Sequence, residues 1–69
     1  MTNNIILYSS NFCPYCVQAK KLLEKLNLNY QEINIQTSPE KRDEMLTKSN
    51  GKRTVPQIFL NEQHIGGFD

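Results

Sequence analysis

The sequence changes its periodicity at a pair of closely spaced cysteines, and this change limits the folds that the chain can adopt. Residues 5–8 are apolar and lie between polar residues, which is typical of a buried β-strand. Beyond Cys13 the apolar residues recur at helical spacing, at Cys16, Ala19, Leu22, Leu23 and Leu26, and lysines occupy the opposite face. The sequence therefore predicts a strand that leads into an amphipathic helix over residues 14–26, with Pro14 in the first turn.

A second strand and a second helix are predicted next. Residues 30–35 partly alternate between polar and apolar side chains, which favours a strand. The segment 37–40 is typical of a helix start, either with Thr37 as the cap and Glu40 reaching back, or with Ser38 as the cap and Pro39 in the first position. We expect this helix to direct Met45 and Leu46 inward and to end at residues 50–51, where Gly51 suits a left-handed turn.

The remaining residues predict a β-hairpin. Residues 57–60 form its first strand, which Pro56 opens because proline cannot donate to a sheet. Asn61 and Glu62 form a two-residue turn, and residues 63–65 return as a short strand. The order β-α-β-α-β-β predicts an α/β fold with a central four-stranded mixed sheet, whose first two strands run parallel through a right-handed crossover.

Length and composition restrict the class of protein further. With 69 residues, we expect one domain over residues 1–69. A formal net charge of +1 argues against a basic nucleic-acid-binding arm. The longest apolar run, residues 5–8, is too short for a membrane span or a secretory signal peptide, so we expect a cytoplasmic protein.

The two cysteines carry the predicted chemistry. A disulfide between Cys13 and Cys16 would close too short a loop to stabilise the fold much. Two cysteines and His64 are too few ligands for a zinc site, so no metal is expected. The start of a helix favours a thiolate at Cys13. Cys16 lies one turn later on the apolar stripe, so the pattern predicts a redox pair with Cys13 as the nucleophile and Cys16 as the resolving thiol.

Three motifs in order resemble those of the dithiol glutaredoxins. They are Cys13-Pro14-Tyr15-Cys16, the segment 54–59 (Thr-Val-Pro-Gln-Ile-Phe) and Gly66-Gly67-Phe68-Asp69, and the resemblance covers residues 5–69. It implies a thioredoxin-like fold and a glutathione-dependent thiol–disulfide oxidoreductase. Its partners would be glutathione and glutathionylated or disulfide-containing proteins, with neither nucleic acid nor a membrane involved.

The resemblance also implies which residues hold glutathione beside Cys13. The Val55–Pro56 bond would be cis, and the Val55 backbone would pair with the cysteine of glutathione. Thr54 would flank that pairing, and Tyr15 would pack along the tripeptide.

Both ends of glutathione would then meet charged groups. Lys52 or Arg53 would contact the glycine carboxylate. Gly67 would let the chain pass close to the ligand, and Asp69 would receive the γ-glutamyl ammonium. His64 receives no role.

The sequence departs from the family pattern in two places. Many glutaredoxins have a lysine three residues before the nucleophile, where this chain has Ser10. The family also has a further helix after its Gly-Gly motif, whereas this sequence stops at Asp69. Without that helix one face of the sheet would lose its apolar cover, so the expected monomer could self-associate.

Two other functions remain open. In the first, Cys13 of two chains and two glutathione molecules would hold a [2Fe–2S] cluster. Pro14 argues against this alternative, because cluster-binding relatives usually have a smaller residue at that position. The second alternative is a folded but inactive fragment.

Overall fold

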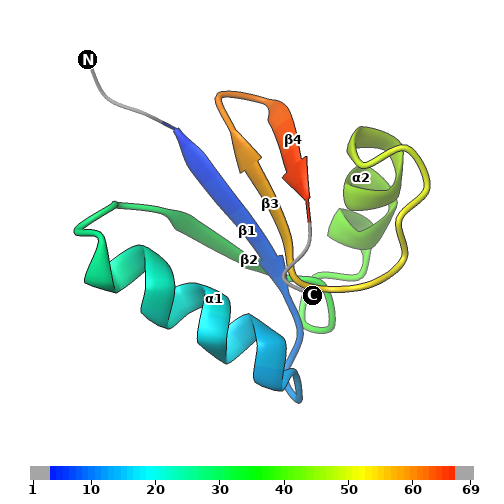
Figure 1. The fold of residues 1–69 in the computed structure, drawn as a ribbon. Coiled ribbons are helices and arrows are strands. Elements are labelled where there is room, and N and C mark those ends of the chain that lie inside the picture. Colours follow the sequence, from blue (N-terminus) through cyan, green and yellow to red (C-terminus); the bar gives the residue numbers. More distant parts are fainter. Residues whose placement is uncertain (1–3, 67–69) are drawn as a thin grey trace.

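The computed structural model describes residues 4–66, which form helices and strands in the predicted order (Figure 1). The elements are β1 (Ile5–Ser9), α1 (Pro14–Lys25), β2 (Gln31–Asn34), α2 (Glu40–Lys48), β3 (Gln57–Leu60) and β4 (Gln63–Gly66). Helix α1 begins at Pro14 as predicted and ends one residue early, with Leu26 as its C-cap. Strand β2 is shorter than predicted by one residue at each end.

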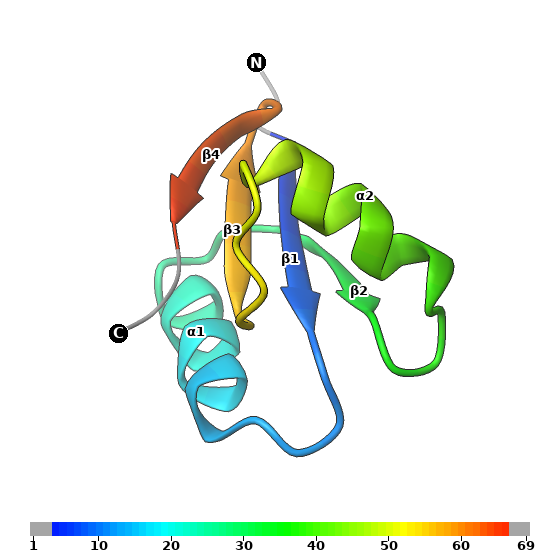
Figure 2. The ribbon, with the colours of Figure 1, turned by 90° about the vertical axis from the view of Figure 1, so that its right-hand side faces the viewer.

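The strands form one four-stranded sheet in the order β2-β1-β3-β4. Strands β1 and β2 run parallel, with Tyr8 opposite Ile33. Strand β3 is antiparallel to both β1 and β4, with Phe59 opposite Ile6 on one side and His64 on the other. The predicted mixed sheet is therefore confirmed, and the two helices lie on opposite faces of it (Figure 2).

The face covered by α2 holds an aromatic cluster of the core. Side chains alternate along a strand, so Ile6 and Tyr8 point to this face while their neighbours point to α1. Tyr8, Met45 and Phe59 are each at most 2% exposed and form one cluster. The Tyr8 and Phe59 rings meet edge to face with centroids 5.5 Å apart, an arrangement that aromatic pairs favour. As predicted, α2 directs Met45 inward; Leu46 is half-buried.

The face covered by α1 is less complete. Cys16, Ala19 and Leu23 are buried as predicted, whereas Leu22 and Leu26 are 44% and 56% exposed. Between α1 and the sheet lies an open groove of about 290 Å³, lined by Ile5, Leu22, Leu23, Leu28, Ile58, Leu60 and Ile65. Within residues 4–66, the sheet face that α1 covers thus keeps an uncovered apolar area.

Both predicted caps of α2 are wrong. The N-cap is Pro39, and no side chain caps the helix. Thr37 Oγ1 instead donates to the Asn34 carbonyl oxygen, because the β2–α2 loop makes its own turn around Asn34. Lys41 N–H donates to the Ser38 carbonyl oxygen, so a backbone carbonyl and not a side chain accepts this N–H of the first helical turn.

The predicted turns are confirmed. After α2, Asn50 and Gly51 have positive φ angles of 62° and 92°, and Gly51 N–H donates to the Leu46 carbonyl oxygen at 2.7 Å. Between β3 and β4, Asn61 and Glu62 have φ angles of 50° and 70°, as a tight two-residue hairpin requires.

Candidate active site

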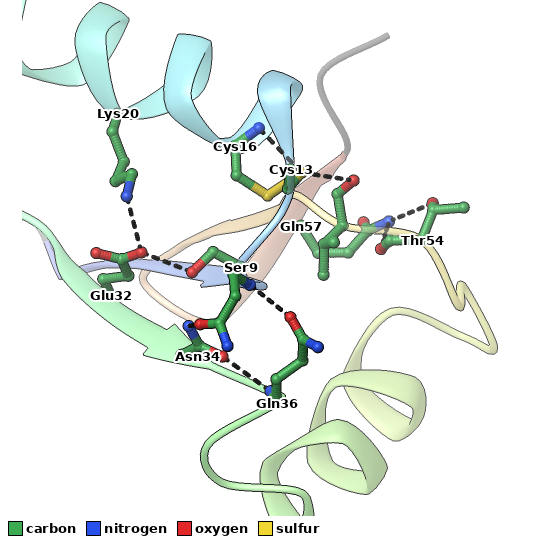
Figure 3. The surroundings of a disulfide bond; sticks show 11 residues. Ser9, Cys13, Cys16, Lys20, Glu32, Asn34, Gln36, Thr54 and Gln57 are labelled. Atoms are coloured by element: carbon green, nitrogen blue, oxygen red, sulfur yellow. Dashed lines mark hydrogen bonds and ion pairs between the residues drawn. A yellow bond between two sulfur atoms is a disulfide. The ribbon is translucent and has the colours of Figure 1, made fainter.

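The cysteine pair lies where β1 passes into α1, and the two residues form a disulfide (Figure 3). Cys13 is the N-cap of α1 and has an extended backbone, so its side chain lies at the helix start. Cys16 lies one turn further along, with a Cα–Cα distance of 5.1 Å, and is only 1% exposed. Cys13 is partly exposed and Cys16 is buried, as expected for a residue on the apolar stripe.

The start of α1 directs a backbone N–H group at the Cys13 sulfur. Cys16 N–H donates to Cys13 Sγ at 3.1 Å. In the reduced protein the same N–H and the positive end of the helix would favour the thiolate over the thiol at Cys13. The Val55 carbonyl oxygen lies 3.6 Å from Cys13 Sγ on the other side. Because an oxidised sulfur carries no hydrogen, this approach is a contact and not a hydrogen bond.

The loop before β3 brings the second sequence motif to the cysteine pair. The Val55–Pro56 peptide bond is cis, as the resemblance implied. Pro56 is buried and Val55 half-buried, whereas Thr54 is exposed. The buried Gln57 side chain holds Thr54 through a hydrogen bond of 2.9 Å to its carbonyl oxygen (Figure 3). The loop therefore presents the Val55 carbonyl oxygen next to the sulfur, and Gln57 holds the residue before it.

A charged contact fixes α1 on the sheet close to the cysteines. The buried Ser9 hydroxyl donates to Glu32 Oε2 at 2.6 Å, and Lys20 Nζ lies 3.1 Å from the same oxygen (Figure 3). The hydrogen bond from Ser9, and then the nearby Lys20 ammonium, hold the pKa of Glu32 below its usual value, although desolvation opposes this. Glu32 is therefore ionised at neutral pH and connects β1, β2 and α1.

Amide side chains fix the loop that precedes Cys13. Asn11 N–H donates to Gln36 Oε1 at 2.6 Å, and Asn34 Nδ2 donates to Asn11 Oδ1 at 2.7 Å. Asn34 Oδ1 accepts in turn from the backbone of Gln36 and Thr37. The β1–α1 and β2–α2 loops are thereby joined at the carboxyl ends of the parallel strands.

The structure describes three of the other predicted site residues, all of them exposed. Tyr15, which lies outside the apolar stripe, is 55% exposed on α1 between the two cysteines. Lys52 and Arg53 are exposed in the loop that leads to Thr54. Gly67 and Asp69 lie outside the described residues.

Three residues near the site were missed by the sequence analysis. Phe12 is 92% exposed immediately before Cys13, and a large apolar residue in a polar loop was the available signal. Gln57 is buried at 2% exposure, and a polar residue inside a predicted strand could have indicated a partner. Ser9 is fully buried, but no local signal connects it to Glu32.

No helix in residues 4–66 is long and apolar enough to cross a membrane. The same residues contain no group of three or more histidine, cysteine or acidic side chains arranged to hold a metal ion.

A cysteine pair that closes a disulfide at the first helix of a β-α-β-α-β-β domain defines a thiol–disulfide oxidoreductase of the thioredoxin-like fold. Residues 5–65 match the glutaredoxin family. Glutaredoxin 1 of Rickettsia prowazekii is 46% identical over 68 residues, which are 97% of this chain and 72% of that protein. Glutaredoxin 3 of Escherichia coli K12 is 47% identical over 66 residues, 96% of this chain and 78% of that one.

Solved structures agree with these relatives. Glutaredoxin 1 from Francisella tularensis, complexed with cacodylate, superimposes with a TM-score of 0.79 at 37% identity and covers 97% of this chain and 85% of its own. A buckwheat glutaredoxin–glutathione complex gives 0.84 at 34% identity, covering 97% and 63%. The chain belongs to the glutaredoxin family: it is a glutathione-dependent thiol–disulfide oxidoreductase with Cys13 and Cys16 as its dithiol active site.

Proposed function

We propose that Cys13 is the attacking thiol and Cys16 the resolving thiol in the reduction of glutathionylated proteins and protein disulfides. The observation that carries this assignment is the hydrogen bond from Cys16 N–H to the partly exposed Cys13 Sγ, whereas Cys16 itself is 1% exposed. A substrate sulfur can therefore reach Cys13, whereas Cys16 can be reached only by groups within the protein.

The reaction with a glutathionylated protein begins at Cys13. The Cys13 thiolate attacks the glutathione sulfur, so that a Cys13–glutathione disulfide forms and the substrate leaves as a thiolate that takes up a proton. A free glutathione thiolate then attacks the glutathione sulfur of this mixed disulfide. Oxidised glutathione leaves, and Cys13 is again a thiolate.

The second route uses Cys16. Its thiol loses a proton and attacks the Cys13 sulfur, which forms the Cys13–Cys16 disulfide and releases reduced glutathione. Two further glutathione molecules reduce that disulfide and become one oxidised glutathione. For a protein disulfide, Cys13 attacks one sulfur and Cys16 then releases the substrate with both thiols reduced.

Glutathione binds in this proposal along the Thr54–Val55 loop. The 3.6 Å separation between the Val55 carbonyl oxygen and Cys13 Sγ supports it, because a peptide that is disulfide-bonded to Cys13 must run beside this backbone. The buried Pro56 supports the loop, Tyr15 packs along the tripeptide, and Lys52 or Arg53 meets the glycine carboxylate. Gly67 lets the chain pass close to the ligand, and Asp69 receives the γ-glutamyl ammonium.

Single cysteine variants test the roles of the two thiols. We expect Cys13→Ser to lose reduction of a small glutathione mixed disulfide and of a protein disulfide alike. Cys16→Ser should keep the first activity and lose the second, because attack by Cys13 on a mixed disulfide does not need Cys16. Glutathione-dependent turnover of both substrates measures this, with circular dichroism to confirm the fold of each variant. A Cys16→Ser protein that is folded and inactive on both substrates would contradict the assignment.

We also propose in which compartment and in which oligomeric state the protein acts. The chain acts as one domain, without a metal, in the cytoplasm, where glutathione keeps thiols reduced. It acts as a monomer, and self-association would use the apolar groove between α1 and the sheet. Sedimentation velocity over a range of concentrations measures the oligomeric state. A brown colour after anaerobic reconstitution with iron and sulfide would indicate a cluster and contradict the metal-free assignment.

A further inference from the structure

The buried amide of Gln57 connects β3 to the loop beside Cys13. Gln57 Nε2 lies 2.9 Å from the Thr54 carbonyl oxygen and 3.3 Å from Thr54 Oγ1. A carbonyl oxygen only accepts hydrogen bonds, and this fixes the orientation of the amide. The NH₂ group of Gln57 faces Thr54, and its Oε1 is left to accept a hydrogen bond from another residue.

His64 on β4 supplies that hydrogen bond. His64 Nε2 lies 2.7 Å from Gln57 Oε1. Because Oε1 carries no hydrogen, the imidazole must be the donor and must carry its proton on Nε2. The His64 ring packs on Phe59, with centroids 4.9 Å apart and planes tilted by 31°, so β3 fixes its orientation. Gln57 and Phe59 are two residues apart on one strand and therefore face the same side of the sheet.

We infer that His64 and Gln57 are positioning residues, which hold Thr54 and Val55 beside Cys13 so that bound glutathione meets the sulfur in register. The chain of contacts runs from His64 Nε2–H through the Gln57 amide to Thr54. The next carbonyl oxygen, that of Val55, lies 3.6 Å from Cys13 Sγ. The inference rests on the proposed binding of glutathione along this loop.

Burial explains why His64 matters for the loop. Gln57 is 2% exposed, so its Oε1 would lose its partner if the imidazole donor were removed. A buried acceptor without a partner is costly, and the amide would turn or draw in water to satisfy it. Either response weakens the hydrogen bonds from Gln57 to Thr54. The opposite end of the loop has its own anchor, because Ser49 Oγ and the Lys52 backbone exchange two hydrogen bonds of 3.2 Å.

Replacing His64 by phenylalanine tests the inference. His64→Phe keeps an aromatic ring against Phe59 and removes the donor. We expect KM for a glutathione mixed disulfide to rise about two- to tenfold with kcat little changed, the effect of losing one hydrogen bond that acts on binding. His64→Gln restores a donor and should recover part of the loss. Gln63→Ala, at an exposed neighbour on β4, is the control and should leave KM unchanged.

Nuclear magnetic resonance provides a readout that does not depend on turnover. The ¹⁵N shifts of His64 should report the tautomer with its proton on Nε2. Order parameters from ¹⁵N relaxation at Thr54 and Val55 should be lower in His64→Phe than in the wild type or in Gln63→Ala. A neutral ring protonated on Nδ1, or unchanged order parameters together with an unchanged KM in His64→Phe, would overturn the inference.

A further variant separates failure of the inference from failure of the proposed glutathione site. When glutathione is disulfide-bonded to Cys13 of Cys16→Ser, the amide signals of Thr54 and Val55 should shift relative to the same variant without glutathione. If these signals do not shift, glutathione binds elsewhere and both ideas fail. If they shift while His64→Phe leaves KM unchanged, the glutathione site stands and the positioning role of His64 and Gln57 is wrong.

Discussion

Cys13 both caps helix α1 and carries one of the two sulfurs of the active site. An N-cap side chain normally uses an oxygen to accept a hydrogen bond from the first turn. Here the sulfur accepts it from Cys16 N–H, and this couples the start of the helix to the chemistry. In the proposed reaction, the same backbone N–H would point at the Cys13 thiolate of the reduced form.

Lys52 and Arg53 provide the test for the charged end of the ligand. Ser10 leaves the usual lysine position of the family neutral, so these two exposed residues are the cations assigned to the glycine carboxylate. A partly exposed ion pair contributes about 0.2–1 kcal/mol. We expect Lys52→Ala/Arg53→Ala to raise KM roughly two- to tenfold at low salt with kcat unchanged, and less at high salt.

Steady-state kinetics with a small glutathione mixed disulfide at two salt concentrations measure this effect. Lys21→Ala, an exposed lysine on α1, is the matched control. An unchanged KM for the double variant at low salt would show that the glycine carboxylate is held elsewhere.

Helix α2 is attached to β1 by one hydrogen bond from the core. The Tyr8 hydroxyl donates to Glu44 Oε2 at 2.7 Å from a fully buried ring. Burial, and then the adjacent Glu44 carboxylate, raise the pKa of Tyr8 far above its ordinary value, so the ring stays neutral. The hydrogen bond from Tyr8, then the charges of Lys48 and Lys41, lower the pKa of Glu44 despite some desolvation.

This contact gives α2 a pH-dependent attachment. Because the pKa of Glu44 is lower in the folded than in the unfolded chain, its contribution is complete above the ordinary value of about 4.5 and is lost as pH falls through the folded value. We expect Glu44→Gln to lower the free energy of unfolding by about 0.5–1 kcal/mol at pH 7, because a neutral acceptor replaces a charged one.

Urea unfolding from pH 7 down to pH 3 checks this expectation. The difference between the wild type and Glu44→Gln should shrink as the pH falls below about 4.5. Glu62→Gln, at an exposed carboxylate in the β3–β4 turn, is the control. A difference that stays constant over this range would show that the charge of Glu44 is not responsible.

For the whole molecule, the two faces of the sheet are closed to different degrees. Met45 on α2 is completely buried, whereas Leu22 on α1 is 44% exposed at the open groove. A truncation at a completely buried position should therefore cost more stability than one at the edge of the open groove. We expect Met45→Ala to lower the free energy of unfolding by about 2–5 kcal/mol, and Leu22→Ala to lower it by less than about 1 kcal/mol.

Chemical denaturation of the two variants compares the faces directly. Leucine and methionine have similar helix propensities, so the change in helix propensity on replacement by alanine differs little between the two variants. If Met45→Ala is too unstable to study, Met45→Leu should fold and cost less than about 1.5 kcal/mol. Equal costs at positions 22 and 45 would mean that the groove is as well packed as the α2 face.

The local features of this protein could be read from its sequence. The apolar run of β1, the helix α1 and the hairpin turn at Asn61 and Glu62 are confirmed, because periodicity and turn chemistry act over a few neighbouring residues. Of the α1 stripe, Leu22 and Leu26 are not buried. The cysteine spacing also determined the exposed and the buried member of the pair. Helix caps were the exception: α2 starts without the predicted cap, since the turn at Asn34 engages Thr37 instead.

Contacts between distant segments were decided only by the tertiary structure. The sequence does not indicate that Tyr8 binds Glu44 or that Gln57 connects His64 to Thr54. Only the family resemblance, and no local pattern, implied that the Val55 backbone lies near Cys13. Each depends on strand register and on which side chains share a face of the sheet. A shift of one residue in β3 would turn Gln57 to the opposite face, so no local pattern can specify these partners.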